Sequence, residues 1–167
     1  MQAKQLRQIQ WLTFRLSGGE YALEVGDVVE VLRMAALARM PEAPPWLAGL
    51  LDLRGRVIPV IDLRLRLGLP AQPAGLDTPI IVAQWAERPV GFIVDEVTEV
   101  LTLFSDALSA PDALTGVGHP VLAVARADGR LILLLDLKRI CEPMLRIGAE
   151  RPEAAESTPL HVVAALH

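Results

Sequence analysis

The feature of this 167-residue sequence that most constrains its fold is an internal repeat. Residues 20–32 share five of thirteen positions with residues 89–101 at an offset of 69. Residues 55–63 share five of nine positions with residues 129–137 at an offset of 74. Chance similarity between β-rich segments is the alternative, but two separate blocks match in the same order. The sequence therefore predicts two structurally similar halves.

Both halves are predicted to consist of short strands joined by tight turns. Apolar and polar residues alternate over residues 11–16, and Ser17-Gly18-Gly19 then signals a turn into a returning strand. Hairpins are predicted in the same way at residues 80–94 and 121–135. This pattern is typical of an all-β protein with tight hairpin connections.

Three local patterns break the run of strands. Apolar residues at positions i, i+3 and i+4 predict a short helix or an irregular turn at residues 27–33 and again at 95–101. Pro59 lies inside a β-branched run and cannot donate to a ladder, which predicts an edge or a bulge there. Asp62 and Asp136 each precede a short helical segment, so both are predicted N-caps.

About five short strands in each half predict two small β-barrels with few free edges. Neither half has enough residues for a generous core of its own, so the two lobes should pack side by side through a shared apolar seam. The first lobe is placed at approximately residues 11–69 and the second at 80–145, with the termini allowed to cross between lobes. Residues 70–79 are the predicted linker, and residues 148–167 a flexible tail.

Composition excludes several classes of function. A net charge of −4 argues against a general nucleic-acid binder and against insertion into an anionic membrane. The most apolar stretch, residues 130–137, is much shorter than the about 20 residues that a spanning helix needs. The single cysteine cannot form an internal disulfide, and the N-terminus lacks the apolar region of a secretory signal. We therefore expect a cytoplasmic protein.

No catalytic, metal-binding or cofactor-binding motif is recognisable. Gly-x-Ser-x-Gly, Walker and His-Glu-x-x-His patterns do not occur, and Gly116-Val117-Gly118 lacks the third glycine of a dinucleotide loop. His119, His161 and His167 lack ligand spacing, and no base lies next to Cys141 to activate its thiol. We expect no enzyme activity, no metal and no cofactor.

The repeat also shows where the halves differ. Arg54 in Leu-Arg-Gly occupies the turn position that Asp128 fills in Ala-Asp-Gly of the second half. Asp-Gly is an ordinary turn dipeptide, whereas nothing in turn geometry requires a long cation. Arg54 is therefore the first candidate for a binding residue. The alternative is a solvated arginine, or one paired with Asp52 or Asp62.

At this point the residues resemble the CheW-like family over about residues 11–145. The resemblance rests on six segments in the right order: Phe14 with 19–23, then 28–31, 49–55, 57–63, 91–97 and 133–136. It implies an all-β fold with short helices, made of two SH3-like five-stranded barrels side by side.

The resemblance also implies a function. Proteins of this family are adaptors without catalytic activity, coupling the cytoplasmic tips of chemoreceptors to the regulatory domain of a CheA-type histidine kinase in membrane-associated arrays. The receptor contacts of the family match Val28, Glu30 and Arg54 in this sequence. For Val28 the alternative is a core position. For Glu30 it is a structural role shared with its repeat mate Glu99.

Three other functions stay open. They are an adaptor of a type IV pilus (twitching motility) chemosensory system, a small-molecule sensor with a pocket in the seam, and a detached regulatory piece of a kinase. A sensor should show convergent polar groups inside an apolar cleft. A receptor adaptor should instead show an exposed apolar groove rimmed by Arg54 and Glu30.

Overall fold

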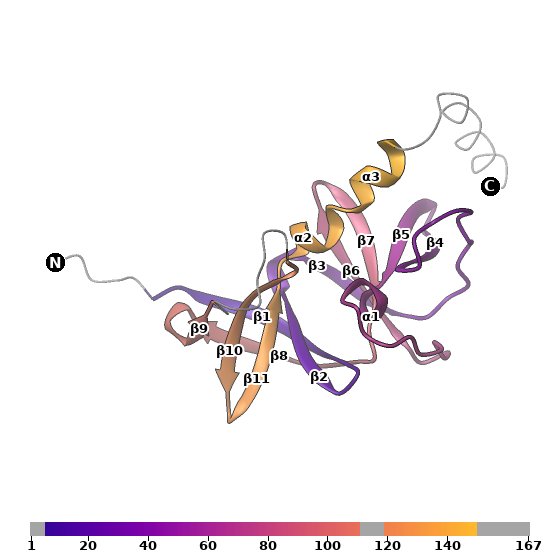
Figure 1. Cartoon of the computed structure of the whole chain (residues 1–167). Helices are drawn as coiled ribbons and strands as arrows, with labels where there is room; N and C mark the ends of the chain where they lie inside the picture. Colours follow the sequence, from indigo (N-terminus) through magenta and orange to yellow (C-terminus); the bar gives the residue numbers. More distant parts are fainter. Residues whose placement is uncertain (1–5, 111–118, 150–167) are drawn as a thin grey trace.

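The computed structural model describes residues 6–110 and 119–149, and it folds into two curved antiparallel-rich sheets side by side (Figure 1). Lobe A is the six-stranded sheet of order β8-β1-β2-β11-β10-β9, and lobe B is the five-stranded sheet of order β3-β6-β7-β5-β4. The strands of lobe A are β1 (Gln8–Leu16), β2 (Gly19–Glu24), β8 (Glu96–Phe104), β9 (Leu108–Ser109), β10 (Val121–Ala127) and β11 (Arg130–Leu135). Those of lobe B are β3 (Val28–Arg33), β4 (Leu47–Leu53), β5 (Arg56–Asp62), β6 (Pro79–Trp85) and β7 (Arg88–Ile93).

Short helices connect these strands. They are the 3₁₀ turns η1 (Val25–Asp27) and η2 (Ser105–Ala107) and the α-helices α1 (Leu63–Arg66), α2 (Leu137–Cys141) and α3 (Met144–Ala149). The predicted all-β fold with short helices and two SH3-like lobes is confirmed, with the two-residue β9 as an additional strand of lobe A.

The internal repeat is visible in the topology. Strands β8-β1-β2-β11-β10 of lobe A correspond one by one to β3-β6-β7-β5-β4 of lobe B. In each lobe the single parallel pair lies at the same place, between β2 and β11 in lobe A and between β7 and β5 in lobe B. The two halves of the sequence therefore adopt the same fold.

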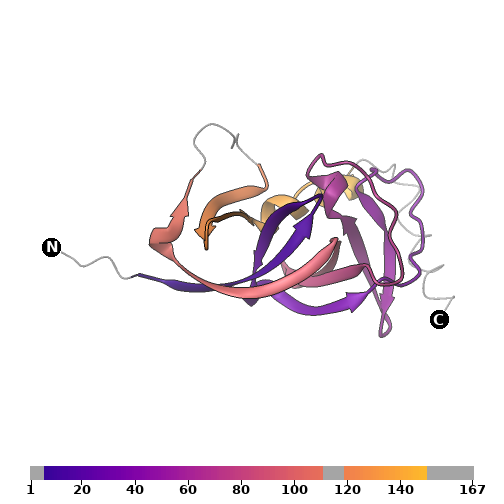
Figure 2. The ribbon, with the colours of Figure 1, turned by 90° about the horizontal axis from the view of Figure 1, so that it is seen from below.

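The lobes do not follow the order of the sequence, however. Hairpin β1–β2 lies in lobe A with strands of the second half, and hairpin β6–β7 lies in lobe B with strands of the first half. The boundaries at residues 11–69 and 80–145 therefore do not separate the lobes, because each half gives its first hairpin to the other lobe. Figure 2 shows the chain crossing from one sheet to the other after each of these hairpins.

Three clusters of buried side chains explain this exchange. One fills lobe A around Trp11 and Ile132, and another fills lobe B around Ile58 and Ile80. The third and largest lies between the lobes and takes residues from both exchanged hairpins: Leu12, Phe14, Leu16, Tyr21, Leu23, Ile81, Ala83, Val90 and Phe92. Because both faces of the exchanged hairpins are covered, successive residues are buried in each of their strands, at positions 11–14, 21–23, 80–83 and 90–93. The predicted shared seam is confirmed.

The short helix or irregular turn predicted at residues 27–33 and 95–101 is wrong, because most of both segments belongs to the strands β3 and β8. Each has a β-bulge, since the register skips Val29 in β3 and Thr98 in β8. The additional residue puts Val28 and Val31 opposite Ala83 and Ile81, two members of the same shared core. A bulge thus brings positions i and i+3 to one face and imitates helical spacing.

The other local predictions hold. Asp62 caps α1 by accepting from the N–H groups of Arg64 and Leu65, at 3.1 and 3.4 Å. Asp136 caps α2 by accepting from the N–H of Lys138 at 3.0 Å. Pro59 pairs with Leu50 of β4, and β7 joins β5 only from Val60 onward. Pro59 therefore lies where β5 has a paired neighbour on one side.

Two arginines of α1 tie distant segments together. Arg64 is buried, pairs with Asp95 and donates to the carbonyl oxygen of Gln72 at 3.2 Å. Arg66 donates to the carbonyl oxygens of Arg139 and Ile140 in α2, at 2.9 and 3.0 Å. Burial lowers the pKa of Arg66. These contacts join a helix of the first half to a helix of the second.

Candidate functional site

The candidate site begins at the β4–β5 turn, where Arg54 has a φ of 52° and Gly55 a φ of 82°. The equivalent turn of lobe A has the same form, with φ values of 49° at Asp128 and 74° at Gly129. Both have the positive φ angles of a type I′ hairpin turn, which Asp tolerates better than other non-glycine residues. Local geometry thus disfavours arginine at position 54. Ser17 and Ala86 have similar positive φ angles in the β1–β2 and β6–β7 turns, so the length and charge of Arg54, and not its backbone conformation alone, set this turn apart.

Arg54 is held by Glu30 of β3. Nη1 donates to Oε2 and Nη2 donates to Oε1, both at 3.0 Å, in a bidentate pair. The Arg54 side chain is 73% exposed and that of Glu30 24%. The hydrogen bonds to the Glu30 carboxylate and its charge raise the pKa of Arg54. Glu30 therefore orients a permanently charged guanidinium whose remaining N–H donors face solvent.

The turn itself is fixed by a neighbouring carboxylate. Asp52 accepts a hydrogen bond from the backbone N–H of Gly55 at 3.1 Å. The structure thus brings Arg54 and Glu30 together, from two segments that lie 24 residues apart in the sequence.

Val28, the third predicted site residue, lies differently. It is half-buried, packs against the shared core and pairs with Ala83, whereas Glu30 pairs with Val82 of the lobe B core. Directly opposed residues of antiparallel strands share a face, so the bulge places Val28 and Glu30 on different faces of β3. These contacts favour the core role for Val28.

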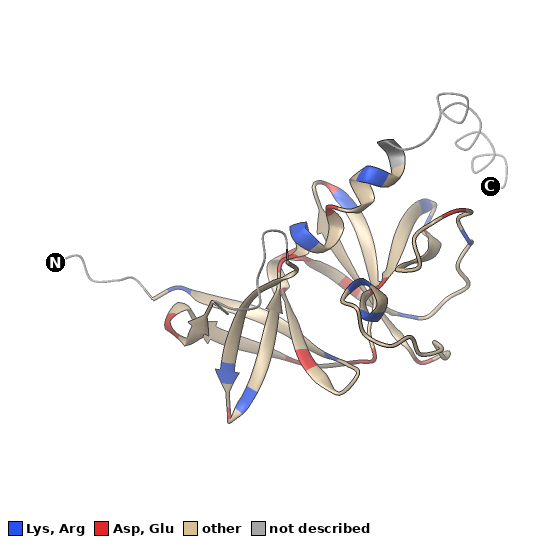
Figure 3. Cartoon of the chain, viewed as in Figure 1, with Lys and Arg blue, Asp and Glu red and all other residues tan. Residues whose placement is uncertain are grey.

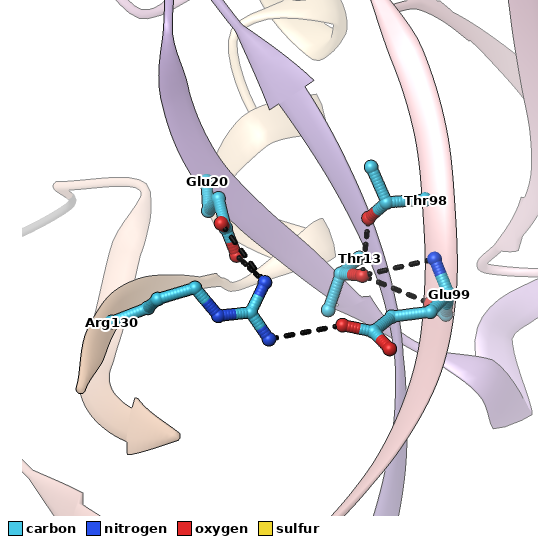
Figure 4. A network of polar contacts seen from close by, with 5 residues as sticks. All are labelled: Thr13, Glu20, Thr98, Glu99 and Arg130. Atoms are coloured by element: carbon cyan, nitrogen blue, oxygen red, sulfur yellow. Dashed lines mark hydrogen bonds and ion pairs between the residues drawn. The ribbon is translucent and has the colours of Figure 1, made fainter. Parts of the chain in front are cut away.

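The corresponding place in lobe A holds a larger network (Figure 4). Arg130 Nη1 contacts both Glu20 oxygens at 3.1 and 3.2 Å, and Nη2 donates to Glu99 Oε1 at 3.0 Å. Thr13, which is buried, shares a 2.6 Å hydrogen bond with Thr98 and bonds the backbone N–H and C=O of Glu99. The sequence analysis missed this network. The repeat offsets, which align Glu30 with Glu99 and Arg56 with Arg130, were the signal.

Two hollows bear on the alternative functions. An apolar groove of about 460 Å³ lies between strands β4, β5 and helix α3. Arg56 and Arg88 line it, and Arg54 and Glu30 do not, so the expected groove rimmed by Arg54 and Glu30 is not what the structure has. A smaller hollow of about 310 Å³ is lined by Trp11 together with the carboxylates of Glu24, Asp27 and Asp136. Burial, and secondarily the charge of Asp136, raise the pKa of Asp27.

His119 and Cys141, which the sequence analysis weighed as a metal ligand and a reactive thiol, are a hydrogen-bond acceptor and a buried residue in this fold. His119 accepts the backbone N–H of Val121 at 3.1 Å, and burial raises the pKa of Cys141 to about 12. His161, His167 and residues 116–118 lie outside the described residues. Within residues 6–110 and 119–149, no group of three or more His, Cys, Asp or Glu side chains could hold a metal ion. In the same part of the chain, no helix has the length and apolarity to cross a membrane.

Comparison with known proteins gives a consistent result. The model of the CheW-like domain matches residues 10–143. The chemotaxis protein CheW of Bacillus subtilis is 33% identical over 133 residues, which cover 78% of this chain and 85% of that protein. The CheW of Helicobacter pylori is 29% identical over 133 residues, covering 79% of this chain and 81% of that protein.

A solved structure supports the same family. The scaffolding protein TtCheW from Thermoanaerobacter tengcongensis superposes with a TM-score of 0.75 at 30% identity, covering 81% of this chain and 94% of that one. Protein PilI of Pseudomonas aeruginosa is 32% identical over 84 residues, which cover 50% of this chain and 47% of PilI. The family model spans most of the chain and both lobes, and the chain therefore belongs to the CheW-like domain family.

Proposed function

We propose that this protein is a non-catalytic scaffold that couples chemoreceptors to a CheA-type histidine kinase, and that Arg54 and Glu30 form its receptor contact. The observation that carries the proposal is the exposed Arg54 guanidinium, held by Glu30 at a turn position whose geometry disfavours arginine. The family match supports the class of partners. Such a scaffold would act by holding both partners and raising their effective concentration for one another.

The physics of the pair suits a docking contact. Arginine presents a planar fork of N–H donors, and two of them are occupied by Glu30. The others would bind carboxylates or carbonyl oxygens at the cytoplasmic tip of a receptor. Exposed charge pairs at an interface act on specificity and on the association rate more than on affinity. We propose Val28 as an indirect contributor, which supports β3 from the core side.

The kinase would bind elsewhere. Exposed apolar side chains of lobe A include Val100, Phe104, Leu122 and Leu131, with 43–57% of their surface accessible. These are candidates for pairing with a barrel of the kinase regulatory domain. Cytoplasmic location at membrane-associated receptor arrays follows from the same proposal.

The test is receptor binding by the variant Arg54→Glu, measured by pull-down with receptor cytoplasmic fragments and, separately, with the kinase. We expect receptor capture to fall by about a hundredfold, since like charges then face each other at positions 30 and 54, while kinase capture is unchanged. The matched control is Arg126→Glu, an exposed residue of β10 in lobe A. Receptor capture at the wild-type level by Arg54→Glu would rule out the assigned contact.

A charge exchange separates contact from support. The double variant Glu30→Arg with Arg54→Glu restores an ion pair but reverses its outer charge. If Arg54 contacts the receptor, this double variant stays defective. Recovery of binding would instead show that the pair only stabilises β3. Co-purification from the native cell then identifies the pathway, flagellar or type IV pilus, through the kinase and receptors captured.

A further inference from the structure

The apolar groove of lobe B, between α3 and strands β4 and β5, has no described segment that covers it. Its walls include Val57, which is 40% exposed, and Leu145 of α3, which is 63% exposed. The volume of about 460 Å³ lies within the range of hollows that hold a compact ligand. Helix α3 has only six residues, too few to be stable in isolation, so it depends on packing against the rest of the fold.

The rim of this groove is basic. Arg56 of β5 and Arg88 of β7 both line it and are exposed, and Arg146 lies on α3 (Figure 3). Within the described residues, neither Arg56 nor Arg88 forms an ion pair, unlike Arg54 and Arg130. The groove thus suits an occupant with an apolar segment and neighbouring carboxylates.

This chain carries such a segment directly after α3. Residues 150–158 contain Glu150, Glu153 and Glu156 with one arginine, and residues 160–166 read Leu-His-Val-Val-Ala-Ala-Leu. Both stretches lie outside the described residues. We propose that residues 160–166 bind in the groove as an intramolecular ligand, with the glutamates of residues 150–158 placed against Arg56 and Arg88.

Length and tethering support this occupant. The groove wall is α3 itself, which ends at Ala149, and the ten connecting residues 150–159 span up to about 35 Å when extended. A short tether gives an effective concentration of about a millimolar, so even weak intrinsic affinity fills the groove. The inference does not depend on the proposed receptor contact, because it concerns this chain alone and is measured without a partner.

A cross-linking experiment in the full chain tests it. The double variant Val57→Cys with Val163→Cys is oxidised mildly at about 1 µM, far below the effective concentration of a tethered segment. The native thiol of Cys141 is buried with a pKa raised to about 12, so it contributes little background. The matched control is Leu131→Cys with Val163→Cys, since Leu131 is the repeat mate of Val57 and is 57% exposed in lobe A.

We expect the intramolecular disulfide at positions 57 and 163 to form at least about tenfold faster than the control disulfide. Equal rates would overturn the proposal. A disulfide between isotopically labelled and unlabelled chains would also overturn it, because a second copy would then occupy the groove.

A second measurement does not need the cross-link. In the single variant Val57→Cys, the thiol at position 57 should react slowly with a soluble alkylating reagent. Adding Leu160→Asp and Val163→Asp, or Arg56→Glu and Arg88→Glu, should raise that rate about fivefold or more by opening the groove. The thiol of Leu131→Cys should be unaffected by the same additions. A position-57 thiol whose reactivity ignores all four substitutions would contradict the inference.

Discussion

The two lobes pair the equivalent glutamates Glu30 and Glu99 with arginines from different positions, Arg54 in the turn of lobe B and Arg130 at the start of β11 in lobe A, and they use the contact differently. In lobe A, Arg130 binds two glutamates that come from β2 and β8, and Thr13 fastens the bulge beside it. In lobe B, Arg54 binds Glu30 alone and stays 73% exposed, against 39% for Arg130. The contact therefore joins three strands within lobe A, whereas in lobe B it leaves a charged guanidinium exposed to solvent.

The β-bulges of the two lobes also differ, in whether their side chains bond to each other or remain exposed. Thr13 and Thr98 of lobe A are replaced in lobe B by their repeat mates, Val82 and Val29. The threonine hydroxyls join two strands of lobe A, while Val29 is 55% exposed beside Glu30. At this position lobe A has polar groups that satisfy each other, whereas lobe B has an exposed apolar side chain beside a charged pair.

The largest expected effect comes from dividing the chain. Residues 1–74 and 75–167, produced separately, should each fail to form a folded monomer, because each half lacks the hairpin that completes its own sheet. Mixed and refolded together, they should give a one-to-one complex with the native circular dichroism spectrum. Dispersed NMR spectra from a monomeric fragment would show that the exchange of hairpins is not required.

The next effect distinguishes the two bulges. Thr13→Val should reduce the free energy of unfolding by about 1–3 kcal/mol, since the backbone N–H and C=O of Glu99 lose partly buried hydrogen bonds to the Thr13 hydroxyl. Urea denaturation measures this change. The reverse substitution in lobe B, Val82→Thr, should cost less, because Val82 pairs with Glu30 as Thr13 pairs with Glu99, so the new hydroxyl would have the backbone of Glu30 beside it. A neutral Thr13→Val would mean that the network in Figure 4 does not stabilise lobe A.

A third prediction concerns the turns of the exchanged hairpins. The β6–β7 turn has positive φ angles at both Ala86 and Glu87, whereas the β1–β2 turn has Gly18 at the position of Glu87. Glu87→Gly should therefore raise the free energy of unfolding by about 1 kcal/mol, and Gly18→Ala should lower it by about as much. Thermal unfolding of the two variants checks both signs. Shifts of equal size and opposite sign would show that the two turns have the same backbone conformation and differ only in residue type.

The smallest effect on stability belongs to the arginines themselves. Arg130→Ala should lower the urea midpoint at low salt, because Glu20 and Glu99 then face each other without a cation. At high salt the difference should shrink, since exposed charges are screened. Arg54→Ala should leave the midpoint unchanged at both salt concentrations. A larger loss for Arg54→Ala than for Arg130→Ala would reverse the comparison between the lobes.

Much of this architecture follows from the sequence. The repeat was predictable from matching blocks of sequence, and the hairpins and the caps at Asp62 and Asp136 were predictable because each depends on residues close together in the chain. The strands β3 and β8 were mistaken for helical turns, since a bulge shifts the apolar period by one residue. The exchange of hairpins depends on packing between distant segments, which residue patterns do not encode.

The candidate site was predictable only in part. Arg54 stood out because its repeat mate is an aspartate, and Glu30 came from the family resemblance. Their mutual contact needed the fold, because it joins a turn to a bulged strand. For Arg130, the paired offsets gave the signal, but without the topology nothing indicated that Glu20 of another strand completes the network.

The exchange of hairpins also bears on the origin of this asymmetry. If the linker at residues 70–79 were cut out, the arrangement would be that of a homodimer whose protomers swap their first hairpins. A true homodimer must carry identical side chains at its two symmetry-related positions. Joining the copies in tandem removes that obligation, so a mutation in one copy leaves the other untouched. Duplication followed by fusion would thus have let lobe A keep an aspartate in its turn while lobe B acquired an arginine.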